Sequence, residues 1–249
     1  MALPCIVGRL GGKSKLKNEI VAEYFPKDYQ ANIYVEPFVG GGSIFFHKEP
    51  SVVEVINDLD ERIYNIFSGA QKYTHEEVSL RLNKDYTKEE FNAIRDSKPD
   101  NDFEKFCKDF YIMKKSILSV GKTWNRDRSK MKVALEGYKE RLADVKIHNT
   151  DYKELIEKYD SPNTFFYLDP PYEKSVGIYK HHRMDMGEMF SLLSNIEGKF
   201  LMSFNDSEGV RKLFEDFNIY ELETSYVKGH NNAKPENITE IIISNYPCF

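Results

Sequence analysis

Short apolar runs, each ended by polar residues or by Gly and Pro, alternate along the first part of the chain. The run 33–36 ends at Pro37, and the run 52–56 ends at Asn57. Between them, residues 43–47 follow three glycines and are predicted to begin a helix. A strand, a glycine turn, a helix and a second strand form a βαβ unit, which predicts a parallel sheet.

The middle of the chain, residues 68–145, carries apolar residues at mostly helical spacing on a background rich in Lys and Glu. This pattern is typical of amphipathic helices with a solvated face. Strand-like runs return at 145–147, 164–168, 199–204 and 240–244. We therefore expect an α/β fold, a Rossmann-like sheet with helices on both faces built by 1–67 and 146–249, with a helical insertion at 68–145.

Composition excludes several classes of protein. The 249 residues include 35 Lys and Arg against 40 Asp and Glu, so the net charge is −5 and a polybasic protein is excluded. No apolar run approaches the roughly 18 residues of a membrane span. The N-terminal residues lack the pattern of a secretory signal, so we expect a cytoplasmic protein that is not secreted and has no membrane partner.

Three cysteines, Cys5, Cys107 and Cys248, lie far apart in the sequence. Their odd number and the lack of a CxxC or Cys/His cluster argue against a disulfide framework and a zinc site. We expect a reducing compartment and no metal.

A glycine turn follows the first predicted strand, at residues 36–42. Such a turn allows close approach of a ligand to the backbone, although a plain structural turn is an equally good interpretation. The dinucleotide fingerprint fails, because its third glycine position holds Phe45. Asp58 ends the next strand 18 residues after Gly40, where a carboxylate can bind ribose hydroxyls or cap a helix.

The segment Asp169-Pro170-Pro171-Tyr172 directly follows an apolar strand. Two prolines stiffen the backbone and remove two N–H donors, which leaves the Pro170 carbonyl and the Asp169 carboxylate as neighbouring acceptors. Tyr172 adds an aromatic face. Two acceptors and a ring suit a planar amine, while a strand terminator is the simpler alternative.

The chain resembles the DNA adenine-N6 methyltransferases of the Dam-like D12, or alpha, group, a class I family that uses S-adenosyl-L-methionine. Five segments carry the resemblance in the family's order, namely 11–20, 35–43, 56–60, 148–152 and 168–172. The family commonly has an aromatic residue two positions before Gly11, where this chain has Arg9. The guanidinium plane of Arg9 is expected to replace that contact.

The resemblance implies a class I methyltransferase sheet and a role for each matching residue. The catalytic residues that it implies are Asp169, Pro170, Pro171 and Tyr172. The cofactor-binding residues that it implies are Arg9, Gly12, Lys13, Phe38, Gly40, Gly42, Asp58, Leu59, Asp151, Tyr152 and Asp169. Within this set, Asp58 is expected on the ribose and Asp151 on the adenine amino group of the cofactor.

The implied reaction transfers a methyl group from S-adenosyl-L-methionine to N6 of a flipped adenine in double-stranded DNA, with S-adenosyl-L-homocysteine as product. Alternatives are an amino-methyltransferase for RNA or for a protein glutamine, and a catalytically silent module that binds cofactor and DNA. Pro4-Cys5 and Pro247-Cys248 lie at the termini, so a nucleophilic cysteine for cytosine C5 is not expected.

Basic residues concentrate in the insertion. Residues 105–141 hold eleven basic and four acidic residues, a net charge of +7, which leaves −12 for the rest of the chain. Arg and Asn can read base edges and Lys can bind phosphate, although a solvated loop is the alternative. The predicted DNA-binding residues are Lys122, Trp124, Asn125, Arg126, Arg128 and Lys130. A cognate restriction endonuclease is a candidate partner, and a monomer or weak homodimer is expected.

Overall fold

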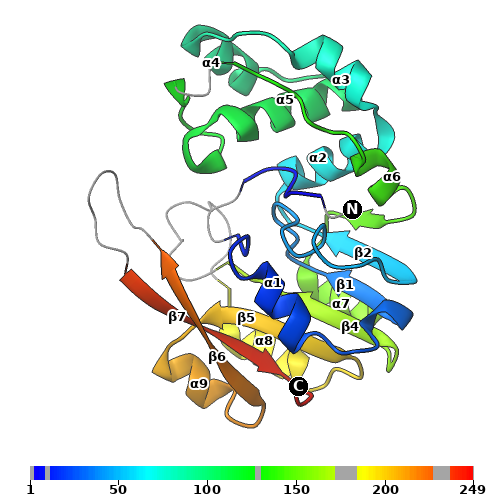
Figure 1. The fold of residues 1–249 in the computed structure, drawn as a ribbon, viewed down its shortest axis with the longest axis vertical. Coiled ribbons are helices and arrows are strands. Elements are labelled where there is room, and N and C mark those ends of the chain that lie inside the picture. Colours follow the sequence, from blue (N-terminus) through cyan, green and yellow to red (C-terminus); the bar gives the residue numbers. More distant parts are fainter. Residues whose placement is uncertain (1–2, 9–11, 127–129, 172–183, 227–235, 249) are drawn as a thin grey trace.

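The structure is a computed structural model that describes residues 3–8, 12–126, 130–171, 184–226 and 236–248. Within these ranges, seven strands form one sheet in the order β3-β2-β1-β4-β5-β7-β6 (Figure 1). The strands are β1 (Ile33–Glu36), β2 (Val53–Asn57), β3 (Lys146–His148), β4 (Thr164–Leu168), β5 (Lys199–Asn205), β6 (Asn218–Tyr226) and β7 (Glu236–Ser244). Strands β1 to β5 run parallel, and β7 is antiparallel to both β5 and β6. The expected α/β fold with a Rossmann-like sheet is confirmed.

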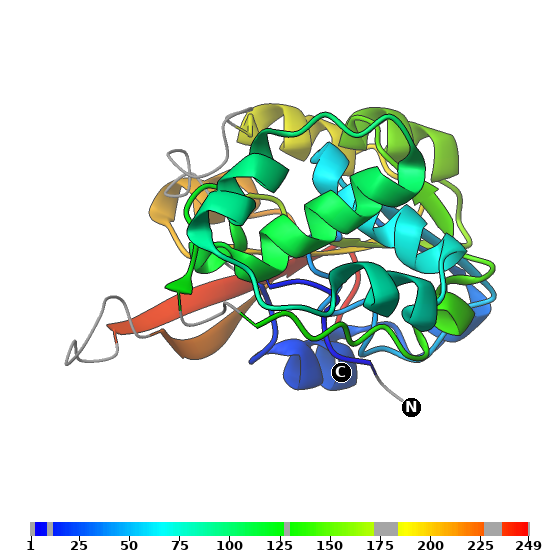
Figure 2. The same ribbon diagram turned by 90° about the horizontal axis from the view of Figure 1, so that it is seen from above.

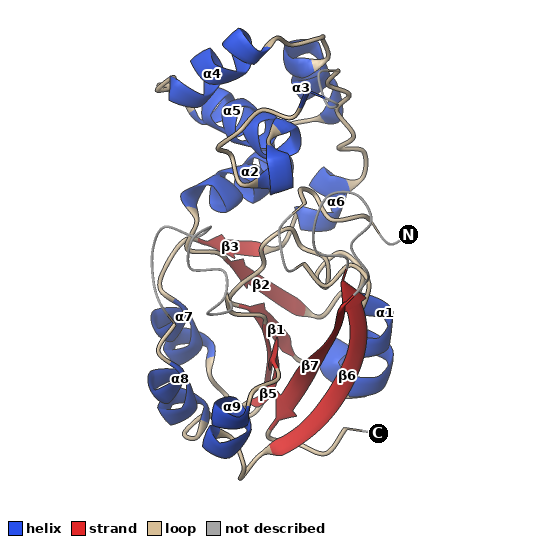
Figure 3. Cartoon of the chain, turned by 90° about the vertical axis from the view of Figure 1, so that its left-hand side faces the viewer, coloured by secondary structure: helices blue, strands red, loops and turns tan. Residues whose placement is uncertain are grey.

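Alternate residues of the central strands enter two separate cores, one on each face of the sheet. Tyr34 and Phe165 belong to the core shared with α2, whereas Val35 and Phe166 belong to the core shared with α7 and α8. Because both faces are covered, the strands read as nearly continuous apolar runs. Figure 3 shows α7, α8 and α9 on one side of the sheet and α1 on the other.

The helices outside the middle segment flank this sheet. On one side lie α1 (Lys17–Glu19), the π-helix η1 (Ile20–Tyr24) and the 3-10 helix η2 (Tyr29–Ala31). The other flanking helices are α7 (Tyr152–Tyr159), α8 (Met186–Leu193) and α9 (Glu208–Leu213).

The predicted helical character of residues 68–145 is confirmed in the described part of that segment. Its helices are α3 (His75–Leu82), α4 (Lys88–Asp96), α5 (Asp102–Lys115), η3 (Ile117–Ser119) and α6 (Tyr138–Leu142). Capping boxes begin α3 at Thr74 and α4 at Thr87. Together with α2 (Glu61–Lys72), helices α3 to α5 form one end of the molecule, nearest the viewer in Figure 2.

Helix α2 crosses the predicted boundary at 67/68, so the sheet part and the helical part share one continuous helix. Gly69 of α2 lies against the Phe106 ring of α5, where a Cβ would approach ring carbons to 2.1 Å. Close packing on α5 therefore holds the shared helix α2 against the rest of the helical segment.

One prediction about secondary structure is wrong, and one strand was not predicted. Residues 43–47 form turns instead of starting a helix: Phe46 N–H donates to Gly42 C=O at 3.0 Å, but Pro50 follows closely and prevents extension. The sequence reasoning also missed β6, a strand at the sheet edge whose residues Ile219 and Leu222 lie among polar neighbours. Strand β7 begins at Glu236, four residues before the predicted start.

Candidate active site

Two loops meet where the strand order of the sheet reverses. Strand β1 pairs on one side with β2 and on the other with β4, with Val35 opposite Phe166. The loop 37–42 therefore leaves the sheet beside Asp169-Pro170-Pro171, and open α/β sheets bind ligands in the crevice at such a point. Pro170 is buried, and Pro171 and Asp169 are partly exposed.

The glycine loop needs each of its three glycines for a different reason. Gly40 and Gly42 have φ of 51° and 77°, in the left-handed region that side chains disfavour. Gly41 instead lies against the N-terminal segment. Ile6 N–H donates to the Gly41 carbonyl at 3.0 Å, and a Cβ on Gly41 would lie 2.2 Å from the Val7 carbonyl oxygen. The family resemblance implied that the Gly40–Gly42 backbone lines the cofactor, but the contact of Gly41 with residues 6–7 was not predicted, because only folding brings them together.

Asp58 connects the end of β2 to the glycine loop. Its Oδ2 accepts from Gly40 N–H at 3.0 Å and its Oδ1 from Asp60 N–H at 2.9 Å. Leu59 beside it keeps 49% of its surface exposed. A partly exposed carboxylate and an apolar face thus lie next to a loop whose backbone a ligand can approach.

Asn57 was not predicted as a site residue, yet it joins three strand ends. Its buried amide donates to Pro37 C=O at 3.0 Å and to Thr150 C=O at 3.1 Å, and it accepts from Thr150 N–H at 2.9 Å. These bonds fix the loops after β1, β2 and β3 relative to one another.

Asp151 and Tyr152 begin α7 on the same edge of the sheet. Asp151 Oδ1 accepts from Lys153 N–H at 2.9 Å, so this carboxylate caps the helix. The Tyr152 ring lies 5.3 Å from the Phe38 ring, centroid to centroid. The structure thus brings together Phe38 and Tyr152, two residues predicted to bind cofactor.

Asp169 is held by a buried polar cluster. Its Oδ1 accepts from Lys13 Nζ at 2.6 Å and from Ser203 Oγ at 3.1 Å, and Lys13 Nζ also lies 3.5 Å from Glu240 Oε2. Lys13 and Glu240 are almost fully buried. Because the ammonium and the hydroxyl bind the same oxygen, the Asp169 carboxylate is fixed in orientation as an anionic acceptor.

Ser203 and Glu240 were missed as site residues. The signal in the sequence is a single polar residue inside an apolar run: Ser203 within 199–204 and Glu240 beside three isoleucines. Ser203 Oγ also lies 3.1 Å from the Tyr167 hydroxyl. The polar cluster therefore extends from Asp169 through the sheet.

Some predicted residues lie outside the described part of the chain. These are Arg9, Tyr172 and Arg128. Gly12, the half-buried residue before Lys13, lies within it.

A fully buried carboxyl, Glu36, lies just before the glycine loop. Tyr34 O–H donates to it at 2.6 Å, and burial raises the pKa of Glu36 to about 8 despite the opposing effects of Tyr34 and Lys48. In the unfolded chain this pKa lies near 4.5. The folded chain therefore resists ionisation of Glu36, and its stability falls as the pH rises from about 4.5 to about 8.

Glu36→Gln removes this penalty. The free energy of unfolding of the variant minus that of the native chain is expected to be larger at pH 8.5 than at pH 5, by at least about 1 kcal/mol. Urea unfolding at both pH values measures this difference. The same difference at both pH values would contradict a protonated Glu36 in the folded chain.

The predicted DNA-binding residues separate into two groups. Lys122, Arg126 and Lys130 are exposed. Trp124 instead packs against the core, and its buried Nε1 has no hydrogen-bond partner among the described residues. Asn125 is half-buried, with its N–H donating to Lys115 C=O at 2.8 Å. The structure favours packing over DNA contact for Trp124.

The +7 charge of the segment 105–141 is not all available to a ligand. Lys115 is buried and donates to the Lys130 carbonyl, and Arg141 binds Glu54 at 2.9 Å through Nη2. Burial lowers the pKa of Lys48, the other cation at Glu54, to about 8. Two of the counted cations thus stabilise the fold.

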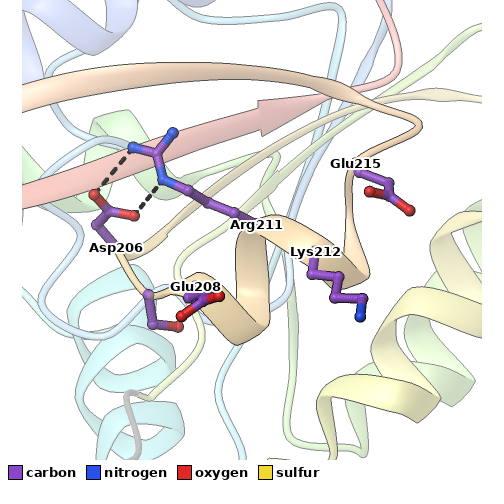
Figure 4. Close-up of a pocket in the computed structure, with 6 residues that line it drawn as sticks. Asp206, Glu208, Arg211, Lys212 and Glu215 are labelled. Atoms are coloured by element: carbon purple, nitrogen blue, oxygen red, sulfur yellow. Dashed lines mark hydrogen bonds and ion pairs between the residues drawn. The ribbon is translucent and has the colours of Figure 1, made fainter.

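An open pocket of about 550 Å³ lies after β5, lined by Asp206, α9 residues and Glu215 (Figure 4). Arg211 Nε binds Asp206 at 2.6 Å and its Nη2 binds Glu221 at 2.6 Å. Because Arg211 is already paired with Asp206 and Glu221, this pocket is a weaker candidate than the crevice at β1 and β4.

The described residues contain no group of three or more His, Cys, Asp or Glu arranged to hold a metal ion. They also contain no helix that is long and apolar enough to cross a membrane.

Comparisons with known proteins agree with this geometry. The sequence profile of a family described as D12 class N6 adenine-specific DNA methyltransferase matches residues 10–227. The type II methyltransferase M1.LlaDCHI of Lactococcus lactis subsp. cremoris is 25% identical, over 95% of this chain and 93% of its own. The type II methyltransferase M.CviBI of Paramecium bursaria Chlorella virus NC1A is 25% identical, over 97% and 99%.

Proposed function

We propose, since the chain belongs to the D12 class N6 adenine-specific DNA methyltransferase family, that it methylates N6 of a flipped adenine in duplex DNA with S-adenosyl-L-methionine. One observation carries the proposal most: Asp169 is fixed by Lys13 and Ser203 beside Pro170-Pro171, at the crevice shared with the glycine loop. The type II names of its relatives support a cognate restriction endonuclease as a partner.

The residues of the crevice fit the proposed cofactor. Asp58 offers a carboxylate to a ribose diol, Leu59 an apolar face to a purine, and Gly40 a backbone that a ligand can approach closely. Phe38 and Tyr152 supply aromatic surface nearby. When bound, S-adenosyl-L-methionine supplies a methyl group on a positively charged sulfur.

Asp169 has the main catalytic role in this proposal. An adenine N6 is a weak nucleophile, because its lone pair is delocalised into the ring. Bonds from its two N–H groups to Asp169 and to the Pro170 carbonyl favour a tetrahedral nitrogen and stabilise the positive charge that develops on it. Lys13 and Ser203 hold the carboxylate in place, so little reorganisation is needed at the moment of reaction. Tyr172 is the proposed stacking partner of the flipped base.

Methylation of random-sequence duplex DNA, followed by single-molecule sequencing, tests the proposed function. We expect modified adenines within one short sequence. Modification of RNA but not of duplex DNA, or of no nucleic acid, would contradict it.

The exposed cations of the helical insertion are proposed to bind the DNA backbone. The triple change of Lys122, Arg126 and Lys130 to Gln is expected to lower DNA affinity at least about tenfold and to reduce the salt slope of binding by up to about three. Fluorescence anisotropy at several salt concentrations measures both.

A matched triple change controls for the lost charge. Lys27, Lys158 and Lys212 are exposed in the sheet part of the chain, and their change to Gln lowers the net charge equally. We expect the control to keep the native salt slope. Equal losses in the two triples would show that the DNA-binding surface lies elsewhere.

A further inference from the structure

A continuous set of hydrogen bonds runs from the glycine loop into the helical insertion. Gly40 N–H binds Asp58 Oδ2, and Asp60 N–H binds Asp58 Oδ1. Asp60 in turn caps α2 by accepting from Arg62 N–H at 3.1 Å. Asp58, the residue at the proposed ribose site, thus lies two residues before Asp60, the N-cap of the helix that both parts of the chain share.

Arg62 extends this set of bonds to the insertion. Its Nε and Nη2 bind the two oxygens of Asp60 at 3.0 and 2.8 Å, and its Nη1 donates to Val120 C=O at 3.1 Å. A two-pronged guanidinium–carboxylate pair fixes the direction of the third N–H. The orientation of Asp60 therefore sets where Val120 can lie.

The segment around Val120 is closed by its own bonds. Ile117 N–H donates to Thr123 C=O at 2.8 Å, and Gly121 N–H donates to Ser116 Oγ at 2.8 Å. Gly121 has φ of 78°, and a Cβ there would lie 2.5 Å from Arg62 Nη1. Segment 116–126 is therefore one hydrogen-bonded loop packed against Arg62, and it carries the exposed Lys122 and Arg126.

We propose that Arg62 is a positioning residue that couples cofactor binding at Asp58 to DNA binding by segment 116–126. This inference rests on the proposed function. A ligand that fixes Asp58 also fixes Asp60 and Arg62, and with them the cations of the segment. By linkage, DNA bound to that segment favours the same arrangement of Asp58, so the coupling is reciprocal.

Arg95 provides a matched control. Its Nη1 donates to Lys122 C=O at 3.2 Å, in the same segment. Its guanidinium pairs with the exposed Asp96, which is not part of the hydrogen bonds that lead to Asp58. Arg62→Ala and Arg95→Ala each remove one arginine bond to the segment, and only the first breaks the connection to Asp58. Arg62→Lys keeps the charge but loses the two-pronged pair.

The experiment compares DNA affinity with and without saturating S-adenosyl-L-homocysteine, on a duplex that carries the sequence found by methylation mapping. We expect the ligand to tighten DNA binding by the native protein about tenfold. Arg62→Ala and Arg62→Lys should reduce this ratio below about threefold, and Arg95→Ala should keep it. Thermal unfolding checks that the three variants are folded.

The outcomes separate the inference from the proposed function. If the native protein shows no change with S-adenosyl-L-homocysteine, or if both Arg62 variants keep the native ratio, the inference is overturned. A loss of coupling in Arg95→Ala equal to that in Arg62→Ala also overturns it, because any anchor of the segment would then suffice. Failure of the native protein to bind S-adenosyl-L-homocysteine in calorimetry would instead overturn the proposed function itself.

Discussion

Asp169→Ala is expected to reduce methyl transfer to DNA by about two to three orders of magnitude or more, while cofactor affinity changes little. The alanine removes the anionic acceptor that the proposed mechanism aims at adenine N6. Lys13 remains beside Glu240, so the change leaves no buried charge without a counterion. Single-turnover rates with labelled cofactor measure the loss, and calorimetry with S-adenosyl-L-homocysteine measures the affinity.

Two further variants sharpen this test. Asp169→Asn keeps the shape of the side chain but not the charge, and we expect a loss of similar size. Asp206 also directly follows a parallel strand, but it pairs with Arg211 at the surface pocket, so Asp206→Ala should retain near-native activity. Native-like turnover by Asp169→Ala would rule out the proposed role of this carboxylate.

Gly41→Ala is expected to destabilise the chain by about 3 kcal/mol or more, because its methyl group would overlap the Val7 carbonyl oxygen, 2.2 Å away. The obstacle is backbone, which cannot rotate aside as a side chain can. Displacing residues 6–7 also disturbs the segment that leads to Lys13, so activity should fall with stability. Urea unfolding measures the first effect.

Gly209→Ala is the matched control. Gly209 lies inside α9, and a Cβ there meets nothing within 4 Å. Alanine at this helical position should stabilise the chain by about 0.5–1 kcal/mol. An unchanged urea midpoint in Gly41→Ala would mean that the N-terminal segment does not pack on the glycine loop.

The strand ends that form the crevice could be predicted from sequence because their signals are local. Asp169 directly follows an apolar run, and Asp58 follows another run with only Asn57 between them. Such a run ended by a polar residue or proline predicts a strand end. Parallel strands then bring their carboxyl ends to one edge. The five segments of the family resemblance, in their common order, supplied the rest of the predicted cofactor crevice.

Residues that act through distant partners could not be predicted. Glu240 meets Lys13 only because β7 lies beside β5, and Arg62 meets Val120 only because α2 packs on α5. The net charge of residues 105–141 likewise overestimates the charge available to DNA, because Lys115 and Arg141 bind partners within the protein. Pattern alone cannot separate a buried cation from an exposed one when both lie in a polar, amphipathic segment.

The most direct measurement is the identity of the methylated nucleoside. Duplex DNA is incubated with the native protein and S-adenosyl-L-methionine that carries an isotope-labelled methyl group, then digested and analysed by mass spectrometry. We expect the label in N6-methyldeoxyadenosine, with no label above background from Asp169→Ala. Label in a methylated cytosine, or no label in DNA under conditions where the protein binds its cofactor, would contradict N6-adenine methylation by this site.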